Sequence, residues 1–472
     1  METAEIDDRY SIGKFRDQRL GDIGKLLHYR IAEQNTVCLR QLSDTEATQR
    51  RFHRFLESRK VTPSEITRVC SERTALAAVG RDVLAIQDTC ELDYTAHAKR
   101  TANLGGISSN KGRGLFIHPV LVVDAQSHAC LGIVHQQAWV RDLDAPPKNT
   151  RRPIEEKESM RWVEGAQTAA RRLQQAASVT VVADRESDIY EEWDRIPDEH
   201  THLLTRAHYD RQLNVGDTLF EWLKKQPAKG SYILDVPARS AGKAYQSTNG
   251  ARSSPRTAHK AHMELRYGQV TILRPLGCKA EKASITLSVI EVCEIPETVP
   301  PSEQPVRWIL LTDHVVDTAK KALEVLGWYQ QRWLIEQLFR TLKRQGLGIE
   351  ASQLEDADKL IKLTCIATQV AARTIQLVNA RDGDTDQPAS DAFDAEEVVV
   401  LGKLQEKLQG KTPRQKNPHP LNSMAWAAWT IARLGGWKGS SREAKPGPIT
   451  MLHGLQYFDG IVRGWNLAKV WG

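Results

Sequence analysis

Residues 318–345 read TAKKALEVLGWYQQRWLIEQLFRTLKRQ, and the rest of the chain is organised around them. The stretch predicts one helix, because strong helix formers dominate it, Thr318 can cap its start, and Gly346 can end it. At 3.6 residues per turn, one side of this helix forms an apolar stripe that faces a core. The residues of that stripe are Leu334, Ile335, Leu338, Phe339 and Leu342.

A second face of the same helix carries polar groups of several kinds. Tyr329, Arg332, Glu336 and Lys343 fall within about 60° of one another around the axis, so a phenol, a guanidinium and an ammonium bracket one carboxylate. One interpretation is a solvated face with local Glu–Arg pairing. The other is a face that grips phosphate and base and presents one metal-binding carboxylate, which also explains the adjacent Trp333.

The composition bounds the class of protein. At 472 residues the chain predicts about two to four domains, and its formal net charge of +6 is compatible with nucleic-acid binding without establishing it. The seven cysteines are scattered without a CxxC pair, which predicts reduced core thiols. The polar N-terminus excludes a signal peptide, and no apolar run is long enough to span a bilayer. We therefore expect a cytoplasmic protein without a membrane partner.

Sequence pattern divides the chain into a helical start, a long α/β middle and a helical end. Helical patterns dominate residues 1–70, and strand patterns begin near residue 81. The middle part, residues 71–370, predicts a mixed sheet with helices packed on it, interrupted at about 210–317 by mostly β signal. The tail within residues 371–472 is helical, and its clustered tryptophans could fill a small core or anchor another subunit.

Two aspartates stand where apolar strands end. Asp88 lies in VLAIQDT and Asp184 in VTVVADRES, and either alone is more often a cap or turn former. With Glu336 they make three oxygen-only ligand groups, which suit Mg²⁺ or Mn²⁺ and not zinc. A pair of divalent cations would offset the repulsion among the carboxylates and stabilise in-line displacement at phosphorus. The rival acids that spacing leaves open are Asp93, Asp124, Glu186 and Asp188.

The spacing Tyr329-x2-Arg332-x3-Glu336-x6-Lys343 resembles the signature of the insertion-sequence-four family of DDE transposases. The resemblance continues in AIQDT, ADRESDI, LGGISSNKGRGLFIHPVLVV, GIVHQQAWVR, EEKES and IARLGGW, so it covers most of the chain. It implies a ribonuclease-H-like catalytic core interrupted by a β insertion domain at about residues 210–317. It also implies a helical N-terminal domain that binds DNA ends and a helical C-terminal dimerisation domain.

The resemblance implies roles for individual residues. Asp88, Asp184 and Glu336 match a metal-binding catalytic triad, which implies two Mg²⁺ ions per active site, with Mn²⁺ as a substitute. Three residues match contacts to transposon-end phosphates near a flipped base: Tyr329, Arg332 and Lys343. Trp308 matches a residue that stacks on that base, and Trp333 matches one that enters the space the base leaves in the DNA helix. Arg206 matches a contact to a further phosphate, and Arg54 matches a DNA contact of the N-terminal domain. After Leu20-Gly21-Asp22 this chain has Ile-Gly-Lys instead of the family's paired basic residues, which leaves the N-terminal end contacts open.

The implied function is cut-and-paste transposition of double-stranded DNA by a homodimer, in the bacterial cytoplasm in association with the nucleoid. Transposon ends are cleaved through a hairpin intermediate, and the free 3′-OH then attacks target DNA. Two alternatives stay open: a structure-selective nuclease without strand transfer, and a non-catalytic DNA-binding regulator of transposition. The Tyr–Arg–Lys stripe with Trp308 argues against the first, and the three carboxylates argue against the second.

Overall fold

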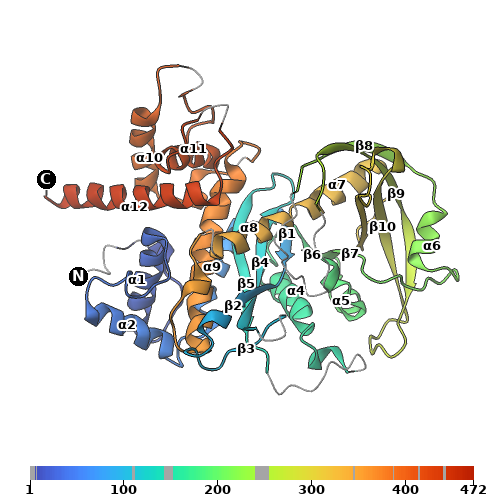
Figure 1. Ribbon diagram of the computed structural model, residues 1–472, viewed down its shortest axis with the longest axis horizontal. Coiled ribbons are helices and arrows are strands. Elements are labelled where there is room, and N and C mark those ends of the chain that lie inside the picture. Colours follow the sequence, from blue (N-terminus) through green and yellow to red (C-terminus); the bar gives the residue numbers. More distant parts are fainter. Residues whose placement is uncertain are drawn as a thin grey trace.

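A computed structural model describes residues 6, 8–108, 112–142, 152–239, 255–343, 346–385, 387–412, 415–439 and 443–471. Figure 1 shows a twisted sheet with helices packed on it at one end of the molecule and a group of helices at the other. The long helix α9 (Ala357–Ala380) stands between these two parts.

One mixed sheet contains all eleven strands of the described part of the chain. The strands are β1 (Asp82–Gln87), β2 (Cys90–Asp93), β3 (Gly105–Gly106), β4 (Arg113–Asp124), β5 (Cys130–Trp139), β6 (Ser178–Ala183), β7 (Thr201–Arg206), β8 (Gly230–Val236), β9 (His259–Leu273), β10 (Ser284–Glu294) and β11 (Arg307–Thr312). In its first half the order is β5-β4-β1-β6-β7, with β4 antiparallel to β1 and β5, and with β6 parallel to both β1 and β7. This is the strand order of a ribonuclease-H-like fold, so the predicted fold class is confirmed.

The sheet is covered on both faces, which explains why its central strands are almost continuously apolar. Along β1, Val83 and Ala85 face the core under α4 (Met160–Arg172) and α5 (Tyr190–Arg195). Leu84 and Ile86 face the opposite core, which α8 (Trp333–Leu342) and α9 close. Because successive side chains of a strand point to opposite faces, the four apolar residues of β1 alternate between the two cores.

The predicted β insertion extends the same sheet. β11 pairs antiparallel with β7, and β10, β9 and β8 follow in order, each antiparallel to its neighbour. The helix α6 (Leu219–Lys224) packs beside β9. Residues 240–254 of this region lie outside the described residues.

The predicted single helix over residues 318–345 is wrong in one respect, because it is two helices. α7 (Ala319–Gln330) begins at the predicted cap Thr318, whose side chain accepts a hydrogen bond from Lys321 N at 3.2 Å, and α8 ends at Leu342. Between them, Gln331 N and Arg332 N donate to carbonyls three residues back, at 3.1 Å each. The helical ladder therefore tightens from i−4 to i−3 bonds at this turn, as in a 3₁₀ segment.

Helices form both ends of the chain. The remaining helices are α1 (Gln18–Gln34), α2 (Glu46–Glu57), α3 (Pro63–Ala77), α10 (Ala395–Leu408), α11 (Met424–Leu434) and α12 (Pro448–Trp471). The divisions predicted at residues 70 and 371 fall inside α3 and α9, and the domain assignment stays a prediction. Trp426 and Trp429 in α11 are buried, Trp426 in a core shared with α9, which supports the small-core interpretation for these two tryptophans. Among the described residues, no helix is long and apolar enough to cross a membrane.

Candidate active site

Asp88 and Asp184 lie side by side because their strands do. β1 and β6 are parallel neighbours, and the last pair in their register is Ile86 with Val182. Asp88 is the first residue after β1, and Asp184 is the first residue after β6. Because carboxyl ends of parallel strands meet at one edge of a sheet, the two carboxylates emerge there together.

The chain leaves the ladder at Asp88. Pairing with β4 stops at Gln87 opposite Val120 and resumes at Cys90 opposite Ile117, so the same register places Asp88 opposite Pro119. Proline has no N–H to donate to a ladder. Asp88 is therefore free of strand pairing, and its Oδ1 accepts a hydrogen bond from Thr89 N at 2.7 Å.

Arg332 connects the third carboxylate to the first. Its Nη1 lies 3.0 Å from Asp88 Oδ2, and its Nη2 lies 2.6 Å from Glu336 Oε1. Glu336 is on the first turn of α8, and Arg332 is the residue that precedes this helix. The tight turn between α7 and α8 thus places one guanidinium between two carboxylates from distant parts of the chain.

The electrostatics of these groups are coupled. Burial raises the pKa of Asp88, and the negative charges of Asp184 and Glu336 raise it further, whereas Arg332 acts in the opposite direction. Burial alone lowers the pKa of Arg332, but Tyr329, Asp88 and Glu336 together raise it above its ordinary value. Arg332 is therefore a permanent cation in a cluster of acids.

The donor set suits a hard divalent cation, because it consists of carboxylate oxygens from Asp88, Asp184 and Glu336. In the described part of the chain, however, no three His, Cys, Asp or Glu side chains converge as a ready-made metal site. Arg332 hydrogen-bonds two of the three acids and supplies positive charge between them. The residues fit a divalent cation in chemistry, and its entry would require Arg332 to release Asp88 and Glu336.

Besides Arg332, three of the predicted DNA contacts lie next to the carboxylates. Tyr329 is buried, and the charges of Arg332, Arg206 and Asp184 act on its phenol. The ring of Trp308 on β11 meets the Tyr329 ring edge-on, with centroids 6.0 Å apart. Arg206, at the end of β7, donates from Nη2 to the Arg307 carbonyl at 3.1 Å. A half-buried tryptophan, a tyrosine and a cation thus stand together beside the acids.

The other three predicted contacts are more spread out. Lys343 ends α8 in an extended conformation, and its Nζ lies 3.5 Å from Glu350 Oε1. Trp333 is 47% exposed, with the Arg340 guanidinium 5.0 Å from its ring centroid. Arg54 is exposed on α2, which packs against α9 at the helical end of the molecule (Figure 1). The structure therefore does not bring Arg54 together with the carboxylates of its own chain.

The rival acids have structural partners. Asp188 is fully buried and paired with Arg211 at 2.5 Å, and Asp124 caps a turn and lies 3.3 Å from Arg81. Asp93 caps Thr95 N at 2.8 Å. Glu186 Oε2 lies 3.0 Å from Arg161 Nη2, and Glu186 N donates to Asp184 Oδ1 at 2.8 Å. Glu186 thus supports the site through its backbone, and the other three shape loops.

Sequence reasoning missed a set of buried polar residues behind the site. Gln87 and His118 are fully buried in the apolar strands β1 and β4, and Glu192 is fully buried in α5. Their signal in the sequence is a polar residue inside an apolar run, as in VLAIQDT and LFIHPVLVV. Such residues need hydrogen-bond partners in the core.

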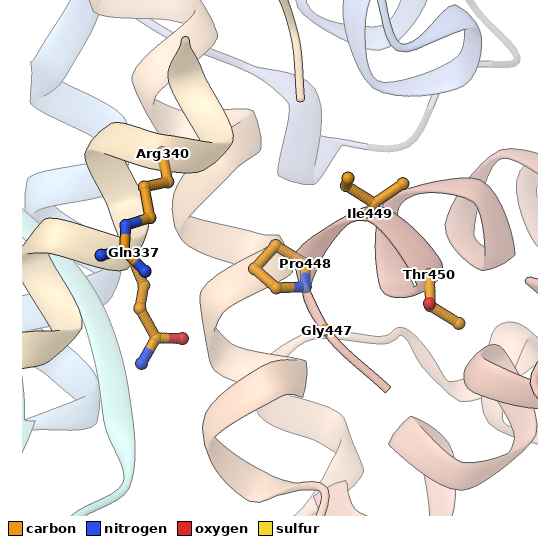
Figure 2. Close-up of a pocket in the computed structure, with 6 residues that line it drawn as sticks. All are labelled: Gln337, Arg340, Gly447, Pro448, Ile449 and Thr450. Carbon is orange, nitrogen blue, oxygen red and sulfur yellow. The ribbon is translucent and has the colours of Figure 1, made fainter. Parts of the chain in front are cut away.

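A shallow pocket of about 310 Å³ flanks the site without containing the carboxylates. Figure 2 shows Gln337 and Arg340 on α8 facing Pro448 and Ile449 at the start of α12. Gln337 follows Glu336 directly on α8. The pocket therefore lies between the outer surface of α8 and the C-terminal helix.

The comparisons with known proteins give one family. The family described as "Transposase DDE domain" matches residues 93–368, more than half of the chain. Asp184 and Glu336 lie inside this match, and Asp88 lies five residues before it. A cryo-EM structure titled as a piggyBac transposase synaptic complex with hairpin DNA is similar at 8% identity and a TM-score of 0.35, over 83% of this chain and 77% of that one.

Proposed function

Because the chain belongs to the DDE-domain transposase family, we propose that it is a cut-and-paste transposase of the insertion-sequence-four type. It would cut double-stranded DNA at transposon ends, pass through a hairpin intermediate, and join the ends to target DNA. The observation that carries this proposal is that Asp88 and Asp184 lie at adjacent strand ends and that Arg332 bonds both Asp88 and Glu336.

Asp88, Asp184 and Glu336 would hold two divalent cations, Mg²⁺ or Mn²⁺. When bound, such cations lower the pKa of an attacking hydroxyl and neutralise the charge that develops on phosphate. Each step then exchanges one phosphodiester oxygen for another. Water releases a 3′-OH at the transposon end, that 3′-OH attacks the opposite strand, water reopens the hairpin, and the same 3′-OH attacks target DNA.

The positively charged side chains near the site would bind the phosphates of the DNA backbone. Arg332 and Arg206 lie on or beside the carboxylate cluster, and Lys343 ends α8 beside Glu350. A phosphate bound at the cluster could draw Arg332 away from Asp88 and Glu336. Charge-assisted bonds to phosphate are of the same strength class as those to carboxylate, so this exchange costs little. DNA binding would thus open the acids to metal.

Trp308 would receive an extruded base. A hairpin requires the 3′-OH of one strand to reach across the duplex, and extruding one base relaxes that turn at a cost of a few kcal/mol. Stacking on an aromatic ring offsets roughly 1–3 kcal/mol of this cost. The half-buried ring of Trp308 stands against Tyr329, one turn of helix from Arg332. Trp333, partly exposed on α8, would enter the space that the base vacates.

We place the homodimer contact on the C-terminal helix α12. Trp426 and Trp429 are buried within their own chain and are therefore not available to a partner. In contrast, α12 exposes Tyr457 and Ile461, at 63% and 38%, one helical turn apart. Arg54 on α2 would contact DNA away from the acids of its own subunit, as expected if two subunits share two DNA ends. The protein would act in the cytoplasm at the nucleoid.

The test uses DNA made from the two genomic flanks of the gene that encodes this chain. We expect wild-type protein with Mg²⁺ to cut these flanks and to join them to a supercoiled plasmid. Asp184→Asn should lose both reactions and still shift the flanks in a gel. The matched control is Asp93→Asn, a nearby exposed acid whose loop bond to Thr95 an amide oxygen can keep; it should retain both reactions.

The other outcomes separate the alternatives. Cutting without joining would identify a nuclease, and binding without metal-dependent cutting would identify a regulator of transposition. An Asp184→Asn protein that cuts as the wild type does would show that the acids named here do not form the active site.

A further inference from the structure

Six polar side chains form a closed set behind the two aspartates, and we refer to them as the polar ring. The members of the polar ring are Arg161, Thr89, His118, Gln87, Glu192 and Ser187. Four of them are completely buried between β1, β4, α5 and the 3₁₀ turn Arg185–Ser187. A buried polar group that lacks a partner costs about 1–3 kcal/mol, so the way in which these groups satisfy one another is informative.

The buried part of the polar ring is a continuous chain of hydrogen bonds. Thr89 Oγ1 lies 2.9 Å from His118 Nδ1, and His118 Nε2 lies 3.2 Å from Gln87 Oε1. Gln87 Nε2 donates to Glu192 Oε1 at 3.2 Å, and Ser187 Oγ donates to Glu192 Oε2 at 2.5 Å. The chain therefore runs through the core from the residue after Asp88 to the third residue after Asp184.

Arg161 closes the ring on the solvent side. Its Nε donates to Thr89 Oγ1 at 2.8 Å, and its Nη2 donates to Glu186 Oε2 at 3.0 Å. The backbone N–H groups of the same two residues hold the aspartates, because Thr89 N donates to Asp88 Oδ1 at 2.7 Å and Glu186 N donates to Asp184 Oδ1 at 2.8 Å. One guanidinium thus fixes both residues that orient the two carboxylates.

The polarity of the chain follows from its members. Burial lowers the pKa of His118 well below its ordinary value, so the imidazole is neutral and has one donor and one acceptor nitrogen. With the Gln87 amide placed as observed, its oxygen accepts from His118 Nε2–H, and His118 Nδ1 accepts from the Thr89 hydroxyl. Thr89 Oγ1 is then left to accept from Arg161. Each of these contacts of His118 and Thr89 has one donor and one acceptor, as a rigid buried network requires.

We propose that the polar ring positions Asp88 and Asp184 and so sets the affinity of the site for divalent cations. The inference rests on the proposed function, because it takes these two aspartates to be metal ligands. The members of the ring are positioning residues, since they act through Thr89 N–H and Glu186 N–H. Hydrogen-bond partners behind metal ligands typically contribute about 10- to 100-fold in metal affinity.

The test compares two substitutions at Thr89 in the full-length protein without DNA. Thr89→Val keeps the shape of the side chain and removes its hydroxyl, whereas Thr89→Ser keeps the hydroxyl. We expect Thr89→Val to weaken Mn²⁺ binding about 10- to 100-fold, as measured by calorimetry and by electron paramagnetic resonance. Thr89→Ser should bind within about threefold of wild type, a small fraction of one such contribution. Ser187→Ala, at the other end of the ring, should also weaken binding and serves as a second variant if Thr89→Val does not fold.

Thr374→Val is the control for loss of a buried hydroxyl. Thr374 is fully buried in α9, where its Oγ1 donates to the Val370 carbonyl of the same helix. It should leave Mn²⁺ binding unchanged at a similar melting temperature. The inference fails if Thr89→Val and Ser187→Ala bind Mn²⁺ as wild type does while Asp184→Asn does not bind it. It also fails if Thr374→Val weakens binding equally. Unchanged binding by Asp184→Asn would instead refute the proposed site itself.

Discussion

Arg332 is predicted to compete with divalent cations when DNA is absent. Its guanidinium bonds Asp88 Oδ2 at 3.0 Å and Glu336 Oε1 at 2.6 Å, so a cation that binds both acids must displace it. We therefore expect Arg332→Met to bind Mn²⁺ more tightly than the wild type, although it removes a residue from the proposed DNA-binding face.

The size of this gain follows from the two bonds. A hydrogen bond to a charged group contributes about 1.5–3 kcal/mol to stability, but all three side chains are partly exposed, at 18% for Arg332 and Asp88 and 29% for Glu336. Solvent screening and rehydration of the released guanidinium reduce the net cost to about 1–3 kcal/mol for the pair. At about 1.4 kcal/mol per tenfold, the dissociation constant for Mn²⁺ should fall about 5- to 150-fold.

The gain should grow with pH. Without Arg332, the pKa of Asp88 rises further, because burial and Asp184 are then opposed by less positive charge. Protons compete with metal for a carboxylate, so the comparison is made at pH 7 and at pH 8.5. Calorimetric titration of DNA-free protein with Mn²⁺ measures the effect. Arg340→Met is the control, because Arg340 lies on the same helix but stacks on Trp333.

Equal or weaker Mn²⁺ binding by Arg332→Met at pH 8.5 would refute competition. In that case the two bonds would be surface pairs of negligible strength, or the cations would bind through other acids. A similar gain in Arg340→Met would show that the loss of any positive charge near α8 is sufficient, and that the position of Arg332 between two acids is not what matters.

Three further predictions concern Trp308, the exposed residues of α12 and Glu192. Trp308→Ala should slow hairpin formation about 5- to 150-fold and strand nicking much less, in a quenched time course on a labelled end; equal slowing with a lowered melting temperature would make Trp308 merely structural. Joint replacement of Tyr457 and Ile461 by glutamate should abolish the complex that holds two DNA ends in light scattering, and an unchanged complex would place the dimer contact elsewhere. Burial raises the pKa of Glu192 from 4.5 to about 8. The contribution of its protonation to the stability of the folded state is therefore fully present below pH 4.5 and is lost as pH rises through about 8. The free energy of unfolding of the wild type should therefore fall between pH 5 and 8 relative to that of Glu192→Gln, by up to about 1.4 kcal/mol per pH unit, and the melting temperature should fall with it. A difference between the two proteins that does not change with pH would contradict a neutral Glu192.

Local rules of helix and strand formation accounted for much of the fold. Thr318 caps a helix as expected, and Thr62 does the same for α3, because each hydroxyl accepts a backbone N–H three residues later. The apolar runs that end at Asp88 and Asp184 are parallel neighbours, which is what two acids at strand ends require if they are to meet. In contrast, no proline marks the turn at Gln331, so the tightening of the helical ladder there could not be predicted from local pattern.

The polar ring could not be predicted from the sequence, for another reason. Five of its members lie in five different elements, and Thr89 lies between β1 and β2. Only pairing between strands brings His118 opposite Thr89, through the register that joins β1 and β2 to β4. The apolar pattern of one strand shows which of its faces are buried, but it does not identify the strand with which it pairs. A single histidine in an apolar strand signals that a partner exists, but it does not say which residue the partner is.

The two sets of contacts around Asp88 differ in how readily they can change. On the inner side, the polar ring is buried and fully bonded, so moving Thr89 would leave several core groups without partners. On the outer side, Arg332 is partly exposed and can exchange a carboxylate for a phosphate at little cost. Metal binding should therefore change the contacts of Arg332, on the side of the site that faces DNA, and leave the buried contacts of the polar ring as they are. Such an arrangement would restrict full occupancy by cations, and hence cleavage, to protein that already holds a DNA end.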